Sequence, residues 1–196
     1  MKKIIIFLAL FFITKSFLFA QTSFKFNQYN IFYDGALQPI ATLFTNHQIS
    51  EKFGFNSYFY VNAYEKSSWG EGLLGFSYAI NKFVKVGFLG GFQTNETEIW
   101  RIAPIIFMQK NKFSFSGVFE FGGKRYRWDT MAFYHLKKFK LGVEGIKYYK
   151  MIALGPRFEY TLYSKYRINF FYSGLFDVTY GKYASMIGIY AIFGTL

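Results

Sequence analysis

The sequence predicts an all-β fold: an antiparallel β-barrel of about twelve strands that spans a membrane. Three observations lead to this prediction. Aromatic residues make up 24% of the 196-residue chain, although its mean hydropathy is only +0.12. Apolar and polar residues alternate over segments of about ten residues, which is typical of transmembrane strands. No segment after Ala20 contains the roughly 18 apolar residues that a membrane-spanning helix requires.

Residues 1–20 are predicted to be a secretory signal peptide. Lys2 and Lys3 precede an uninterrupted apolar run over residues 4–13, and the small residue Ala20 ends the segment. Lys15 interrupts the apolar character too early for an anchoring helix. We therefore expect cleavage after Ala20, which leaves residues 21–196 as one barrel domain.

The chain is strongly basic, and its charge limits the partners that we expect. Its formal charge is +12, and removal of residues 1–20 with their three lysines lowers this to +9. Export makes nucleic acid an improbable partner, so we expect anionic lipid headgroups, lipopolysaccharide phosphates or small anionic solutes. The alternative is that the lysines only solvate turns. The chain has no Cys, so disulfides do not stabilise the fold.

Alternation separates one apolar face from one mixed polar face in most segments. In one segment the apolar positions are Phe113, Phe115, Phe119 and Phe121, and the polar positions between them are Ser114, Ser116 and Glu120. A soluble β-sandwich or lipocalin-like barrel would place its polar face outward. Here nearly every strand has one face of Phe, Ile, Leu, Val or Tyr, which favours a barrel whose apolar face contacts lipid.

A Lys followed by an aromatic residue recurs through the chain, and we interpret each pair as a tight turn. The successive spacings of 30, 30, 26 and 27 residues each accommodate two strands and their connections, so all five turns are expected on one side of the membrane. The aromatic ring would begin a strand at the headgroup level. The pairs are Lys52-Phe53, Lys82-Phe83, Lys112-Phe113, Lys138-Phe139 and Lys165-Tyr166.

These turns pair ten strands, and residues 183–194 add another. Because an antiparallel bacterial barrel has an even number of strands, we expect residues 24–33 to supply the twelfth, with a turn at Asp34-Gly35. Both termini would then be periplasmic. Residues 24–33 alternate poorly, so a ten-stranded barrel is the alternative. The predicted strands are 24–33, 38–49, 53–64, 73–80, 83–93, 98–109, 113–122, 126–136, 139–148, 151–163, 166–177 and 183–194.

Two prolines fall inside predicted strands. Pro104 follows Ala103 and Pro156 follows Gly155. Because a proline lacks the N–H that a strand ladder needs, we expect a β-bulge at each position.

Taken together, the signal peptide, the alternating strands, the Lys-aromatic turns and the apolar last strand resemble small bacterial outer-membrane β-barrel proteins. The ending Phe19-Ala20-Gln21 also resembles exported proteins of Bacteroidota. The resemblance implies a location in the cell outer membrane, contact with its lipids and lipopolysaccharide, and assembly by the barrel-insertion machinery. It is too general to transfer functional residues.

The polar faces carry charged residues that we expect to point into the lumen. Buried charges must be paired or hydrated, so they are expected either to form a structural ion-pair network or to line a pore. In the second interpretation Arg101, Arg157 and Arg167 belong to a constriction that favours anions. The predicted lumenal residues are Lys85, Arg101, Glu120, Lys140, Glu144, Arg157, Glu159 and Arg167.

The sequence contains no recognisable catalytic motif. His47 and His135 are the only histidines, and neither has a Ser or a carboxylate at an informative spacing. Nucleophile-elbow, metal-pair and phosphate-loop motifs are absent, so we predict no catalytic residue, metal or cofactor. The leading hypothesis is a narrow passive channel for small solutes with a preference for anions. The alternatives are a closed barrel with a structural or surface-binding role, and an outer-membrane lipid-modifying enzyme.

Overall fold

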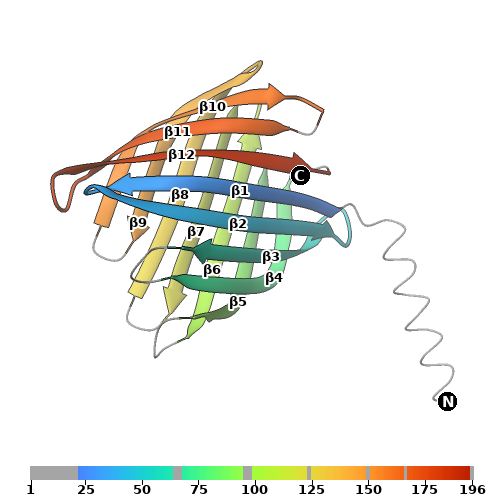
Figure 1. Cartoon of the computed structure of the whole chain (residues 1–196). Coiled ribbons are helices and arrows are strands. Elements are labelled where there is room, and N and C mark those ends of the chain that lie inside the picture. Colours follow the sequence, from blue (N-terminus) through green and yellow to red (C-terminus); the bar gives the residue numbers. More distant parts are fainter. Residues whose placement is uncertain are drawn as a thin grey trace, which may run out of the picture.

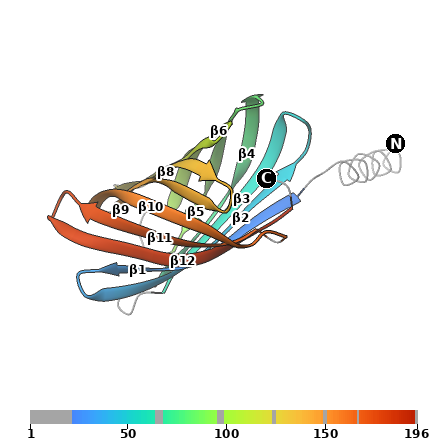
Figure 2. The ribbon, with the colours of Figure 1, turned by 90° about the horizontal axis from the view of Figure 1, so that it is seen from above.

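The computed structural model describes residues 22–63, 68–94, 99–122, 125–148, 151–165 and 167–194. These residues form a closed barrel of twelve antiparallel strands (Figures 1 and 2), in which each strand pairs with its neighbours in sequence and β1 pairs with β12. The predicted signal peptide lies outside the described residues. Within them, no helix is long and apolar enough to cross a membrane. The strands are β1 (Thr22–Tyr33), β2 (Ala36–Gln48), β3 (Phe53–Asn62), β4 (Trp69–Asn81), β5 (Val84–Gln93), β6 (Trp100–Lys110), β7 (Phe113–Gly122), β8 (Arg125–Leu136), β9 (Phe139–Tyr148), β10 (Met151–Tyr163), β11 (Ile168–Asp177) and β12 (Lys182–Phe193).

The twelve-stranded prediction is confirmed, and the ten-stranded alternative is wrong. The uncertain first segment is a complete strand: β1 pairs with β12 from Phe24 to Tyr33 and with β2 over its whole length. A barrel in a membrane must leave no strand edge open, because hydrocarbon offers no hydrogen-bonding partner. Closure of the ladder therefore determines the structure of β1 more strongly than its own alternation does.

The turns divide between the two ends of the barrel as predicted. Asp34 and Gly35 connect β1 to β2, and their φ angles of 51° and 76° are the positive values that a two-residue type I′ hairpin requires. The five Lys-aromatic pairs lie at the opposite end, where β1 begins and β12 ends (Figure 1). Only Tyr166 of these pairs is outside the described residues. We call the two ends the hairpin end, at Asp34-Gly35, and the terminal end.

The predicted bulges at the two prolines are wrong. The register of β10 against β11 is the same on both sides of Pro156, and that of β6 against β7 is the same on both sides of Pro104. In an antiparallel ladder each residue directs its N–H to one neighbouring strand only. A proline therefore interrupts one ladder and leaves the other intact, and Pro156 keeps its place opposite Val143 of β9. The register shifts that occur lie beside terminal-end turns, at residues 79–81 and 161–163.

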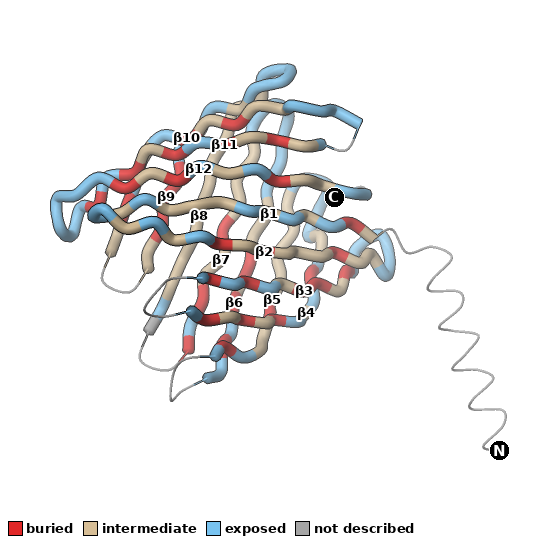
Figure 3. Tube along the Cα trace, in the orientation of Figure 1, coloured by how far each residue is buried: buried red, intermediate tan, exposed pale blue. Residues whose placement is uncertain are grey.

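The exterior of the barrel is its apolar face, as the alternation predicted. Phe76 and Phe92 point outward and expose 61% and 65% of their surface, whereas their neighbours Ser77 and Gln93 are buried. Figure 3 shows the same alternation of exposed and buried positions along the strands. The lumen is consequently the interior that the described strands enclose, and it holds both the apolar core clusters and the buried charges.

Candidate functional site

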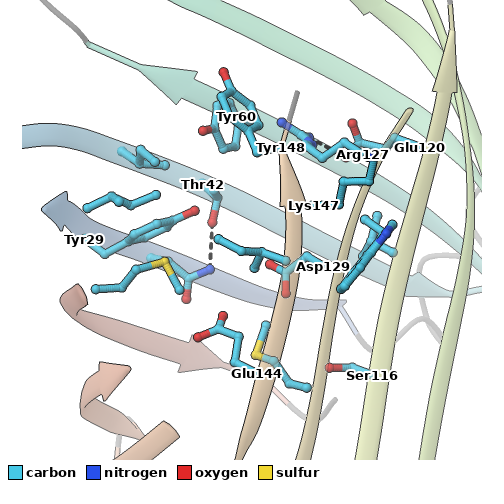
Figure 4. Close-up of a pocket in the computed structure, with 18 of the residues that line it drawn as sticks. Tyr29, Thr42, Tyr60, Ser116, Glu120, Arg127, Asp129, Glu144, Lys147 and Tyr148 are labelled. Carbon is cyan, nitrogen blue, oxygen red and sulfur yellow. Dashed lines mark hydrogen bonds and ion pairs between the residues drawn. The ribbon is translucent and has the colours of Figure 1, made fainter. Parts of the chain in front are cut away.

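A cavity of about 550 Å³ occupies the lumen, and among the described strands only β4 does not line it. This volume lies within the range of small-molecule sites. Figure 4 shows Tyr29, Thr42, Asp129 and Glu144 directed toward this space from different strands. Its walls combine two clusters of charged side chains with an apolar surface.

The first cluster, which we call the Arg157 cluster, joins side chains of β9 to β12: Lys140, Glu144, Arg157, Glu159, Ser173 and Tyr190. Arg157 is at its centre. Its Nη1 donates to Glu144 Oε1 and Oε2 at 2.9 and 3.1 Å, and its Nε donates to Glu159 Oε1 at 2.9 Å. Lys140 Nζ lies 3.0 Å from Glu159 Oε2, to which the Tyr190 hydroxyl also donates. Ser173 Oγ completes the set by donating to Glu144 Oε2. All four carboxylate oxygens of this cluster are therefore hydrogen-bonded.

Strand register accounts for the assembly of this cluster. Lys140 and Glu159 are direct cross-strand partners on the lumenal face of β9 and β10. Glu144 lies opposite Gly155, two residues before Arg157 on β10. A Cβ at Gly155 would lie 1.9 Å from the carbonyl oxygen of Gly174, so β11 approaches too closely here for another residue.

The second cluster, the Arg127 cluster, lies nearer the hairpin end and joins Tyr60, Trp69, Glu71, Glu120 and Arg127. Arg127 and Glu120 are direct cross-strand partners and form an ion pair. Arg127 Nη2 also lies 3.1 Å from Glu71 Oε1, across the lumen from β8 to β4. The guanidinium group stacks 4.7 Å from the ring centroid of Tyr60 and 5.3 Å from that of Trp69. This arginine is thus held by two carboxylates and two aromatic rings.

Hydrogen bonding is incomplete in and beside the Arg127 cluster. Arg127 Nη1, Glu71 Oε2 and Asp129 Oδ1 are buried and form no hydrogen bond with the residues that the structure describes. Both Arg127 and Asp129 line the cavity. Because buried polar atoms almost always find a partner, the atoms of Arg127 and Asp129 are the natural contacts for water or a polar solute in the lumen.

Apolar residues line the lumen on the side of β4 to β6. Leu73, Leu89, Ala103 and Ile105 are buried there, and Phe44, Tyr58, Phe107 and Val118 pack against them. The cavity therefore has a charged wall and an apolar wall. Such a combination suits an amphipathic solute better than a bare ion.

Comparisons with known proteins identify the fold but no family. No protein-family model and no curated protein sequence matches this chain. Among solved structures, the KdgM porin has a TM-score of 0.63 at 15% identity, covering 85% of this chain and 98% of that chain. The NanC porin has a TM-score of 0.60 at 9% identity, covering 87% and 100%. Outer membrane phospholipase A from Escherichia coli has a TM-score of 0.53 at 11% identity, covering 90% and 97%. At these identities the likeness establishes the porin-type barrel fold alone.

The structure places the eight predicted lumenal residues in five settings. Lys140, Glu144, Arg157 and Glu159 belong to one cluster, and Glu120 belongs to the other. Arg101 lies near the hairpin end, where its Nε donates to Gln93 Oε1 at 3.0 Å. Lys85 faces the lumen near the terminal end and forms no salt bridge with the described residues.

Arg167 departs from the prediction. It lies in the β10–β11 turn, exposed to solvent and with a φ angle of 43°. Arg101, Arg157 and Arg167 consequently do not come together in one ring, because they occupy the hairpin end, the middle and the terminal end of the barrel.

Sequence reasoning missed Glu71 and Arg127. The sequence predicts a strand only from residue 73, which places Glu71 in a connection, whereas β4 begins at Trp69. Arg127 lies inside the predicted strand 126–136, but aromatic and aliphatic residues occupy both faces of that strand and hide its polar face. A signal in the sequence is that Arg127 and Asp129 are two residues apart, so their side chains lie on the same face of the strand.

Both histidines contact a hydroxyl group that the sequence spacing did not reveal. Ser114 Oγ lies 2.7 Å from His135 Nε2 on the lumenal face, and Thr22 Oγ1 lies 2.7 Å from His47 Nδ1 at the terminal end. No described carboxylate hydrogen-bonds to the His135 ring, so an acid–base triad is not assembled there. The described residues also contain no group of three or more His, Asp or Glu arranged to hold a metal ion.

Proposed function

We propose that this protein is a passive outer-membrane channel for small solutes. The observation that carries the proposal is a lumenal cavity of about 550 Å³ inside a closed barrel whose apolar face is outward. The fold likeness to the KdgM and NanC porins supports it, and KdgM has also been solved "in complex with disordered oligogalacturonate". We expect the terminal end, with its short turns, to face the periplasm, and lipids and lipopolysaccharide to surround the barrel.

The proposed preference for anions is weak, because most lumenal charges are paired. Each of the two cluster arginines is bound by two glutamates. Among the lumenal lysines, Lys25, which lies over the Tyr190 ring, and Lys85 form no salt bridge with the described residues. Lys147, which lines the cavity, forms none with them either. The carboxylate of Asp129 opposes their positive charge, and its Oδ1 has no hydrogen bond with the described residues. We therefore expect a slight excess of positive potential, carried by lysines rather than by an arginine ring.

Swelling of proteoliposomes in isosmotic solutes tests the channel. Solutes of the size of a monosaccharide should enter, and the rate should fall as solute size increases. Ser116→Trp should slow entry because Ser116 lines the cavity. Val143→Trp is the control, since Val143 is exposed on the outer face of β9 and should not affect permeation. A folded barrel that admits no solute contradicts the proposal.

A closed barrel with a structural or surface-binding role is the second candidate. It is favoured by the Arg157 cluster, which connects four strands, and by the apolar clusters that fill much of the lumen. This candidate predicts an impermeable but very stable barrel. We do not propose a lipid-modifying enzyme, because the Ser114–His135 contact faces the lumen and not the lipid.

A further inference from the structure

The outer face of β1 differs from that of the other strands because it carries two amides at mid-strand. Phe24, Phe26 and Phe32 point outward at its ends and are exposed. Gln28 and Asn30 have the same parity and lie between them, with Gln28 exposed and Asn30 half-exposed. They are also the reason why this strand alternates poorly in the sequence. Figure 1 shows β1 between β2 and β12 on the near side of the barrel.

The residues around these amides are small or aliphatic. Gln28 lies between Ala41 of β2 and Ile189 of β12, and Asn30 lies between Pro39 and Ile187. The outward hydroxyl of Ser185 follows on β12, opposite Phe32. We call the set of Gln28, Asn30, Pro39, Ala41 and Ser185 the amide patch.

Two outward threonine hydroxyls, in contrast, are hydrogen-bonded within the chain. Thr45 Oγ1 lies 2.6 Å from Ser57 Oγ, and Thr130 Oγ1 donates to the Gly145 carbonyl oxygen at 3.2 Å. Gln28 and Asn30 form no hydrogen bond with the part of the chain that the structure describes. Hydrocarbon cannot replace such a bond, and the polar headgroups lie at the rims of the barrel rather than at mid-strand.

We infer that the amide patch is the interface at which a second copy of this chain binds. Each amide offers both a donor and an acceptor, so identical patches related by a two-fold axis can satisfy one another. The small side chains of Pro39 and Ala41 allow the two walls to approach closely, as small residues do at interfaces within membranes. The inference requires the membrane location of the proposed function, but it does not require that the lumen conducts.

Single-cysteine cross-linking of the full-length protein in outer-membrane vesicles tests the interface. The chain has no native Cys, so each introduced thiol reports only its own position. With a membrane-permeant oxidant, Gln28→Cys or Asn30→Cys should give a disulfide-linked dimer on a non-reducing gel. Val143→Cys, also exposed and at mid-strand on β9, should remain monomeric.

Native mass spectrometry of the protein extracted in mild detergent gives a second measurement. The unaltered chain should be dimeric, and the double variant Gln28→Leu/Asn30→Leu should be monomeric while it keeps the heat-dependent gel mobility of a folded barrel. Thr130→Val, which removes an outward hydroxyl on β8, should leave the dimer intact. A monomeric unaltered protein in the membrane fraction, with no cross-link at either position, would overturn the interface alone. Recovery of the protein as soluble periplasmic material would instead overturn the membrane location.

Discussion

The Arg157 and Arg127 clusters contain the same core, one arginine between two glutamates, but they differ in how completely it is satisfied. In the Arg157 cluster every carboxylate oxygen has a hydrogen bond, and the Arg157 side chain is 5% exposed. In the Arg127 cluster Glu71 Oε2 and Arg127 Nη1 have no partner among the described residues, and the Arg127 side chain is 17% exposed. The same set of charges can therefore either stabilise a barrel wall or keep atoms free to hydrogen-bond a solute.

The difference follows from where each cluster lies in the strand register. The Arg157 cluster is built from four consecutive strands, so its members are near neighbours on one wall. Arg127 must reach across the lumen from β8 to β4 to contact Glu71. The cavity adjoins this contact on the side of Arg127 and Glu120.

The largest expected effect is a difference between the two arginines in how much each contributes to the free energy of unfolding. Arg157→Ala leaves two buried carboxylates without their main partner and should lower the free energy of unfolding by about 3–5 kcal/mol. Arg127→Ala should cost less, about 1–3 kcal/mol, because Glu120 lines the cavity and water there can reach its released carboxylate. Urea-induced unfolding in lipid vesicles, followed by tryptophan fluorescence, measures both values. Equal losses, or a larger loss for Arg127→Ala, would remove the distinction between the clusters.

The next largest effect is expected from charges placed on the barrel wall. It tests whether one face of the wall contacts lipid while the other face, which carries both clusters, lines the lumen. Phe115→Arg places a charge on the outer face of β7 and should cost about 2–4 kcal/mol near the bilayer midplane. Ser116→Arg, one residue along but lining the cavity, should cost much less. Unfolding in vesicles again provides the measurement. If the two substitutions are tolerated equally, the assignment of the two faces is wrong.

The smallest expected effect is a difference in the free energy of unfolding between variants of two tyrosines, one from each cluster. The Tyr190 hydroxyl donates to Glu159, whereas the hydroxyl of the largely buried residue Tyr60 has no hydrogen bond with the described residues. Tyr190→Phe should therefore lower the free energy of unfolding by about 1.5–3 kcal/mol, the usual value for a bond to a charged group. Tyr60→Phe should change it by less than about 0.5 kcal/mol. Similar values for the two variants would show that hydrogen bonding does not distinguish the clusters.

The sequence predicted the fold better than it predicted the site, and the reason is physical. Alternation and turn spacing are local, so they located all twelve strands and the lumenal parity of Arg157 and Glu159. The contact between Arg127 and Glu71 depends on strands that are not neighbours, and no local pattern records it. The outward Gln28 and Asn30 appeared only as poor alternation, because the side on which β1 places them is fixed by its pairing with β2 and β12.

Single-channel recording in planar bilayers tests the central claim, that the lumen conducts past the Arg127 cluster, most directly. The purified, folded protein should give discrete conductance steps with a slight preference for anions. Arg127→Gln, which removes one lumenal cation beside Glu71 and Glu120, should shift the reversal potential toward cations. A folded barrel that gives no steps, or that is cation-selective before any substitution, would contradict the account.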